Sequence, residues 1–149
     1  MTPKNTEVFM QKGFTLIELL IVMIIVSLLV VASVPKYKTA MEKARAQEGI
    51  NDLTLAADQA NGYYMMQEGS YANIKDFLAA GTDSAKQQHF EPLQVQPIYG
   101  TVILSIKSKK AGYTLSIMLS EGAVTRRSCI ADSGNKQADR ICDAIGWGR

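Results

Sequence analysis

The sequence predicts an α+β fold in which a long N-terminal helix packs on a small antiparallel sheet of about three strands. Three observations lead to this prediction. Residues 14–34 form an apolar run that contains a single charged side chain. Residues 36–61 are mainly good helix formers, so the helix should continue beyond that run. Residues 113–120 alternate apolar and polar side chains with the period of two that indicates a half-buried strand.

The apolar run has the length and composition of a membrane-spanning helix. It covers 21 residues, and a helix of roughly 20 residues crosses the hydrocarbon core of a bilayer. A buried helix of a soluble domain would normally carry a polar stripe, and residues 17–34 carry none. A secretory signal matches less well, because its apolar core covers only about 7–15 residues. Basic residues flank the run on both sides, so charge does not set its orientation.

One carboxylate, Glu18, lies inside the apolar run. A carboxylate in a membrane-spanning helix costs roughly 2.5–3.5 kcal/mol on insertion scales, so such a residue is a functional candidate by default. Snorkelling toward the lipid headgroups would explain how Glu18 is tolerated near the start of the run. Snorkelling would not explain why a carboxylate stands there, and a partner for it is therefore expected.

The residues around Glu18 point to that partner. Residues 12–18 read Lys-Gly-Phe-Thr-Leu-Ile-Glu, which closely resembles the type III leader junction of type IV pilins and pseudopilins. In that family a short hydrophilic leader ends in glycine, phenylalanine follows, and glutamate stands four residues later. The resemblance implies that a membrane-embedded aspartyl peptidase cleaves between Gly13 and Phe14 and N-methylates the new Phe14 amine. It also implies that residues 1–13 are a leader on the cytoplasmic side.

Cleavage would leave the Phe14 amine and the Glu18 carboxylate one helical turn apart. Four residues of helix rise about 6 Å, so Glu18 can reach the amine of its own chain or that of a neighbouring subunit. The resemblance implies the second arrangement in an assembled filament. Desolvation nearly cancels the attraction of a buried ion pair, so this pair is expected to set the stagger between subunits more than to add stability.

Pro35 directly follows the apolar run. The residues around it also resemble the end of the apolar segment of type IV pilins. Proline lacks a backbone N–H and clashes with the carbonyl of Val31, so a helix kink is expected at Pro35; a plain end of the membrane helix is the alternative. Residues 35–61 are expected to continue the helix and to pack on a head formed by residues 62–149. Gly62 is expected to stop the helix.

The head is expected to contain one short helix and a β-meander. Residues 73–81 indicate a two-turn helix with Asn73 as N-cap and Gly81 as C-terminal stop. The predicted strands and connections are residues 98–106, a hairpin loop at 107–112, residues 113–120, a tight turn at 121–122 and residues 123–130.

Cys129 and Cys142 are the only two cysteines. An even pair in an exported chain predicts a disulfide, which would stabilise the fold by about 3 kcal/mol in the chain-entropy model. Two free thiols in a reducing compartment, or part of a metal site, are the alternatives, although two ligands make a poor zinc site. The arrangement resembles the C-terminal disulfide loop of many type IV pilins.

Several function classes find little support in the sequence. It contains no nucleophile–base pair, phosphate loop or metal cluster, so we expect no enzyme, no cofactor and no metal site. His89 is interpreted as a solvated loop residue. The net charge of +2 is too small to indicate a nucleic-acid binder. A basic patch could touch DNA or acidic groups of a neighbour, although a charged hairpin tip is the commoner explanation; its residues are Lys107, Lys109, Lys110, Arg126 and Arg127.

The resemblance therefore implies a structural pilin of a type IV pilus, held in the inner membrane as a single-pass subunit and then assembled into an extracellular filament. Its expected partners are identical or related pilin subunits, the prepilin peptidase and an inner-membrane assembly platform. Two alternatives share the N-terminal signature: a pseudopilin of a type II secretion system, and a minor pilin for DNA uptake or adhesion. A membrane-anchored sensor that never polymerises is an alternative of another class.

Overall fold

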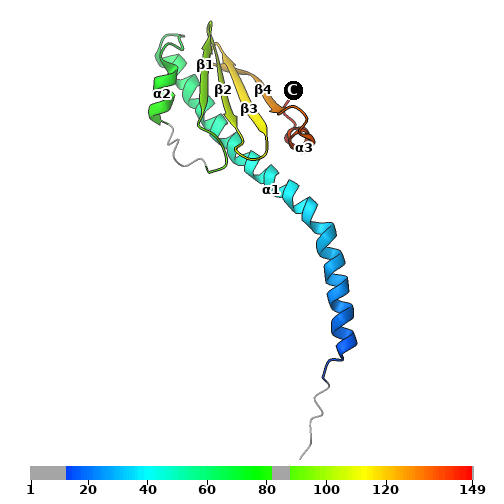
Figure 1. Ribbon diagram of the computed structural model, residues 1–149. Helices are drawn as coiled ribbons and strands as arrows, with labels where there is room; N and C mark the ends of the chain where they lie inside the picture. Colours follow the sequence, from blue (N-terminus) through cyan, green and yellow to red (C-terminus); the bar gives the residue numbers. More distant parts are fainter. Residues whose placement is uncertain (1–12, 82–87, 149) are drawn as a thin grey trace, which may run out of the picture. The chain divides into compact units, whose positions relative to one another are not determined.

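The computed structural model describes residues 13–81 and 88–148 of the chain (Figure 1). The predicted leader, residues 1–13, lies outside the described residues except for Gly13. The chain forms two compact units that divide between Lys38 and Thr39. Each unit is described below on its own.

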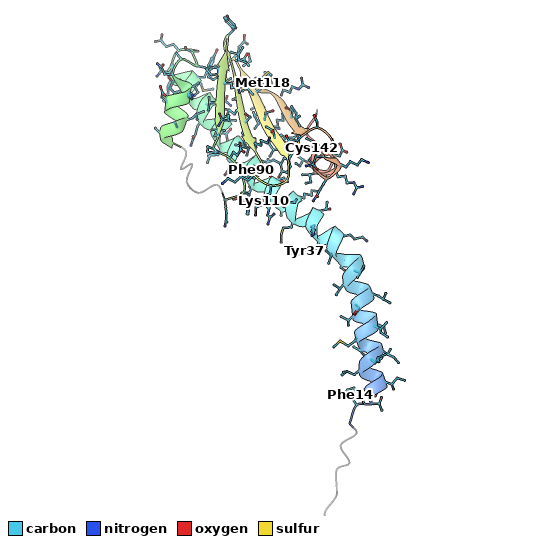
Figure 2. The ribbon with its side chains drawn as sticks, viewed as in Figure 1. Phe14, Tyr37, Phe90, Lys110, Met118 and Cys142 are labelled. Atoms are coloured by element: carbon cyan, nitrogen blue, oxygen red, sulfur yellow. A yellow bond between two sulfur atoms is a disulfide. The ribbon has the colours of Figure 1, made fainter. Side chains whose placement is uncertain are left out.

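The first unit is helical from Leu16, where the helix α1 (Leu16–Met66) begins. Among the described side chains of residues 13–38, every one is exposed. Figure 2 shows side chains projecting from this stretch on all sides between Phe14 and Tyr37. The hydroxyls of Ser27 and Ser33 donate to backbone carbonyls one turn earlier, each at 2.7 Å, so these polar groups are satisfied within the helix.

The membrane-spanning potential of α1 depends on both parts of the helix. Among the described residues, no single helix is long and apolar enough to qualify as a span. Taken together as a bent pair, the stretches Leu16–Val31 and Lys36–Met66 satisfy the same length and composition criteria. The backbone is helical on both sides of Pro35. A kink caused by Pro35 stays a prediction.

The helix α1 ends later than the sequence indicated. It runs to Met66, so the predicted stop at Gly62 was wrong. Tyr63 and Tyr64 provide the reason. The Tyr63 hydroxyl donates to the Ala72 carbonyl and its ring packs 4.7 Å from Phe77, while Tyr64 packs 4.7 Å from Tyr71. These tertiary contacts outweigh the low helix propensity of one glycine.

The second unit contains a four-stranded antiparallel sheet in the order β1-β2-β3-β4. Its strands are β1 (Gln94–Ile98), β2 (Thr101–Lys107), β3 (Tyr113–Ser120) and β4 (Ala123–Ala131). Alternate residues of β3, from Tyr113 to Leu119, are buried, as the alternating sequence predicts. They form one core with Leu53 and several alanines of α1. In Figure 1 this part of α1 runs along the sheet, with α2 (Ile74–Gly81) on the β1 side. The predicted α+β fold is therefore confirmed.

The prediction of about three strands missed β1. The sequence suggested one strand over residues 98–106, but Tyr99 and Gly100 form a two-residue turn that separates β1 from β2. Both residues have positive φ, 38° and 78°, which is the pattern of a hairpin turn that follows the twist of the strands. Pro97 lies inside β1, where it is tolerated because β1 is an edge strand.

The C-terminal helix α3 (Lys136–Ile145) was also missed. Asn135 caps its start, because its side-chain oxygen accepts a hydrogen bond from Ala138 N at 3.1 Å. Gly146 ends it in the left-handed conformation, at φ 75°, and its N–H donates to the Cys142 carbonyl. Three residues of α3 are buried against the rest of the second unit: Ala138, Ile141 and Cys142.

Gly49 allows α1 to approach the sheet closely. A Cβ atom at this position would lie 2.6 Å from the Phe90 ring and 2.9 Å from Ile106. Small side chains continue on the same buried side of the helix, at Ala46, Ala56, Ala57 and Ala60. Gly49 therefore has a packing role in the helix.

Candidate functional site

The predicted cleavage junction, between Gly13 and Phe14, lies just before the start of α1. Gly13, Phe14 and Thr15 precede α1 in non-helical backbone, and all three are exposed, Phe14 to 87%. Among residues 13–81 and 88–148, no atom beyond its chain neighbours lies within 4 Å of the place where a Cβ of Gly13 would stand. The Gly13–Phe14 peptide bond is therefore accessible and free of helical hydrogen bonds in this unit.

Thr15 and Glu18 hold each other at the start of the helix. The Glu18 carboxylate accepts hydrogen bonds from Thr15 N at 3.1 Å and from the Thr15 hydroxyl at 2.9 Å. In return, Glu18 N donates to the Thr15 hydroxyl oxygen at 3.3 Å. This is a reciprocal capping box, which satisfies backbone N–H groups that a helix start leaves without partners.

The capping box gives Glu18 a partner that the sequence analysis did not name. The only partner expected from the sequence was the Phe14 amine of the same or a neighbouring chain. The signal was present in the sequence, because threonine followed three residues later by glutamate before an apolar run is the capping-box pattern. The carboxylate is therefore already drawn toward the helix start before any cleavage creates a free amine.

The surface of the first unit is unusually apolar. Its isoleucine, leucine, valine and methionine side chains from residue 16 to residue 31 are each about half exposed or more, as Ile24 (53%) and Leu29 (63%) illustrate. Soluble monomers rarely expose contiguous apolar surface on this scale, which marks membrane or protein contact sites. Within the chain, this surface is available for an external partner.

Cys129 and Cys142 form a disulfide between β4 and α3, as predicted. Their Cα atoms are 5.3 Å apart, a normal separation for a bridge, and both residues are buried. Neither cysteine is free, so the free-thiol alternative is wrong for this structure. Cys129 N also donates to the Gly148 carbonyl at 3.3 Å, which fastens the chain after α3 to the edge of β4.

The comparisons with known proteins agree with this geometry. Residues 9–34 match the family model described as the prokaryotic N-terminal methylation motif. A curated protein of Dichelobacter nodosus, named "Fimbrial protein", is 30% identical over 153 aligned residues, covering 89% of this chain and 92% of the relative. This chain belongs to the type IV pilin family. No solved structure matches it significantly.

Membership of this family agrees with several features of the pilin described above. The family is one of structural proteins and not of enzymes. Among residues 13–81 and 88–148, no group of three potential metal ligands comes together. The match over residues 9–34 spans both sides of the Gly13–Phe14 junction and includes Glu18. Cleavage and methylation at Phe14 themselves remain predictions.

The five residues of the predicted basic patch do not form one surface in this pilin. Arg126 and Arg127 are neighbours on β4, opposite Met118 and Ile117 respectively, so they lie on opposite faces of the sheet. Lys107 pairs with Asp132 at 3.3 Å. A single surface of all five residues was the less favoured interpretation of the sequence, and the alternation of side chains along β4 excludes it.

His89 is half-buried, so its interpretation as a solvated loop residue was incomplete. Its carbonyl accepts a hydrogen bond from Lys109 N at 3.0 Å, and Phe90 next to it is buried and bridges to Ser108. Residues 89–90 are therefore attached to the end of β2 and form part of the wall of a cavity.

Proposed function

We propose that this pilin is the structural subunit of a type IV pilus. In this proposal, residues 14–34 hold the subunit in the inner membrane as a single-pass helix, and residues 1–13 lie in the cytoplasm. After processing, the same helix packs with those of identical or related pilins in the core of an extracellular filament. Residues 35–61 and 62–149 form its head, and its role is structural and not enzymatic.

The observation that carries the proposal is the exposed apolar surface of residues 16–31 beside the leader junction. Such a surface needs apolar surroundings. In this proposal, lipid provides them before assembly and the helices of other subunits provide them in the filament. The name of the Dichelobacter nodosus relative, "Fimbrial protein", supports the filament as the final one.

We infer that a prepilin peptidase cleaves between Gly13 and Phe14 and methylates the Phe14 amine. The exposed, non-helical backbone at residues 13–15 supports this step, because a peptidase binds an unfolded segment more readily than a helix. Cleavage places a positive charge next to Thr15, whose N–H and hydroxyl already hold the Glu18 carboxylate. An inner-membrane assembly platform would then add the subunit to the filament. There Glu18 would meet the Phe14 amine of its own chain or that of a neighbouring subunit.

Mass spectrometry of filaments sheared from cells tests the proposal. The expected material is this chain, beginning at Phe14 and carrying one N-terminal methyl group. Gly13→Leu should leave uncleaved precursor in the membrane and no filaments. Gly62→Ala is the matched control, since a Cβ at Gly62 meets nothing within 4 Å and no processing depends on it.

Two results would point elsewhere. A mature chain beginning after Ala32 would indicate an ordinary signal peptide and would remove the membrane-storage step. A chain that begins at Phe14 but appears in no sheared filament, and whose deletion blocks export of folded proteins, would favour the pseudopilin alternative.

A further inference from the structure

A cavity of about 140 Å³ lies in the second unit, between α1 and the loop that joins β2 to β3. Its polar lining includes Glu42, Arg45, His89, Ser108, Lys110 and Tyr113. Figure 2 shows Lys110 and Phe90 at this same end of the sheet. Water occupies about 30 Å³ per molecule in the liquid, so the cavity has room for a group the size of a phosphate.

The Tyr113 hydroxyl is the group in this wall that most needs a partner. Tyr113 is fully buried, and its oxygen makes no hydrogen bond of good geometry among the described residues, although the Ser108 hydroxyl lies beside it. Buried hydroxyls are almost always hydrogen-bonded, so an orphan at a cavity wall indicates a ligand or water there. Burial raises the pKa of Tyr113 to about 12, helped by the Glu42 charge and opposed by Ser108 and Arg45. The group is therefore a neutral donor at physiological pH.

The charges around the cavity favour an anion over a cation. Arg45, Lys109 and Lys110 bring three positive charges, against one carboxylate, Glu42, which is paired with Arg45. The Ser108 oxygen accepts from Ala111 N, and the Ser108 hydroxyl also lies beside the Tyr113 oxygen. An oxyanion offers only acceptors, and these walls are rich in donors.

We propose that this cavity is a binding site for a phosphate group, with the Tyr113 hydroxyl and the Lys110 ammonium as its donors. The phosphate could belong to an anionic lipid headgroup or be free in solution. The lipid source rests on the proposed membrane storage of the subunit, since Glu42 follows the end of the apolar run by eight residues. The site itself does not depend on it.

Calorimetric titration of the full-length processed pilin with inorganic phosphate, in neutral detergent at constant ionic strength, tests the site. We expect saturable binding of one phosphate per chain. Tyr113→Phe and Lys110→Ala should each weaken it about tenfold, the cost of one hydrogen bond to a charged group. Lys75→Ala, on the exposed side of α2, is the matched control and should leave the affinity unchanged.

Thermal unfolding of each variant without phosphate separates loss of the site from loss of the fold, because Tyr113→Phe should unfold at the wild-type temperature. Absence of saturable binding would overturn the proposal. So would equal weakening by Lys75→Ala, since that would indicate only general attraction to positive charge.

Repeating the titration in lipid nanodiscs distinguishes a lipid headgroup from free phosphate as the source of the phosphate group. If anionic lipid occupies the site, discs containing phosphatidylglycerol should weaken phosphate binding severalfold relative to pure phosphatidylcholine discs, and Tyr113→Phe should abolish the difference. Equal affinity in both discs assigns the site to soluble phosphate. Filament mass spectrometry reads out the proposed function separately, so its failure would leave the calorimetric result standing.

Discussion

The two units of this pilin use the same kinds of apolar side chain in opposite ways. In the first unit, leucines and isoleucines are exposed around the helix, Leu29 to 63%. In the second unit, Leu53 of the same helix and Leu115 of β3 are completely buried. The difference shows that the two parts of one helix bury their apolar side chains differently. Only the second part is buried within this chain, against the sheet; the apolar side chains of the first part remain exposed.

The side chains that α1 presents to the sheet explain how the second part of the helix is buried. Its buried positions there are mostly small, Ala46, Gly49, Ala57 and Ala60 among them, so the helix approaches the sheet closely. Residues 16–31 are bulky on every side and have no such preferred face. Changes in the second unit should therefore alter folding, and changes in the first should alter assembly.

Glu18→Ala should produce the largest effect and should leave folding unchanged. Each added subunit would bury the Phe14 amine without its partner, at a cost of about 3–5 kcal/mol for breaking one side of a buried pair. Because every subunit of a filament repeats this cost, filaments should vanish. Electron microscopy of sheared material, beside an immunoblot of processed monomer in the membrane fraction, measures both halves of the prediction.

Glu18→Gln is the matched control for this substitution. Glutamine can still accept from Thr15 and so keeps part of the capping box while removing the charge. Loss of filaments in both variants would assign the effect to the charge. Normal filament yield from Glu18→Ala would mean that the carboxylate only snorkels, and the pairing would have to be abandoned.

Removing the disulfide should have the next largest effect, and the effect should be confined to the second unit. The double variant Cys129→Ala, Cys142→Ala loses a bridge with a sequence separation of 13, which corresponds to about 3 kcal/mol in the chain-entropy model. Guanidinium denaturation followed by near-ultraviolet circular dichroism would report the head. Unreduced and reduced wild-type protein provide the control pair, and an equal midpoint for both would contradict the prediction.

Alkaline pH should destabilise the second unit through Tyr113. Its pKa is raised to about 12 in the folded chain, against about 10 in an unfolded one. Tyr113 therefore loses its proton at lower pH in the unfolded state than in the folded state. Its contribution to the free energy of unfolding is fully present below pH 10 and is lost as the pH rises toward 12. The loss should be of order 2 kcal/mol.

Tyr113→Phe should flatten this alkaline decline, and urea denaturation at a series of pH values would measure it. The decline should not disappear, because the pKa of Tyr71 is also raised, mainly by burial. Tyr37→Phe is the control, since Tyr37 is exposed in the first unit. An unchanged slope in Tyr113→Phe would contradict the assignment.

Local patterns in the sequence were sufficient for much of the fold. The apolar run, the alternation of β3 and the cysteine pair each depend on neighbours along the chain or on one rule of chemistry. The missed elements depended on tertiary context. Nothing local distinguishes Tyr63 as a core residue that extends α1 past Gly62, and Pro97 argued against a strand that is allowed only because β1 is an edge.

The candidate site divides in the same way. Gly13, Phe14 and Glu18 are recognisable from their spacing, and the capping role of Thr15 could have been read from the same seven residues. The phosphate cavity could not be read in this way. It combines α1, the segment at His89 and the loop after β2, which are far apart in the sequence and come together only in the folded head.

Two glycines of α1 provide the smallest predicted effect and compare buried with exposed helix positions directly. At Gly49 an added methyl group would stand 2.6 Å from the buried ring of Phe90, so the ring would have to move. Overpacking of this kind costs about 1–3 kcal/mol, more than the roughly 1 kcal/mol that alanine gains over glycine in a helix. Gly49→Ala should therefore destabilise the head slightly.

Gly62→Ala is the counterpart at an uncrowded position. Its added methyl group meets no atom within 4 Å, so it should stabilise the head by about 0.5–1 kcal/mol. Thermal unfolding of both variants in the same detergent would measure the difference. Equal stabilisation by both would contradict the close approach of α1 to the sheet at Gly49.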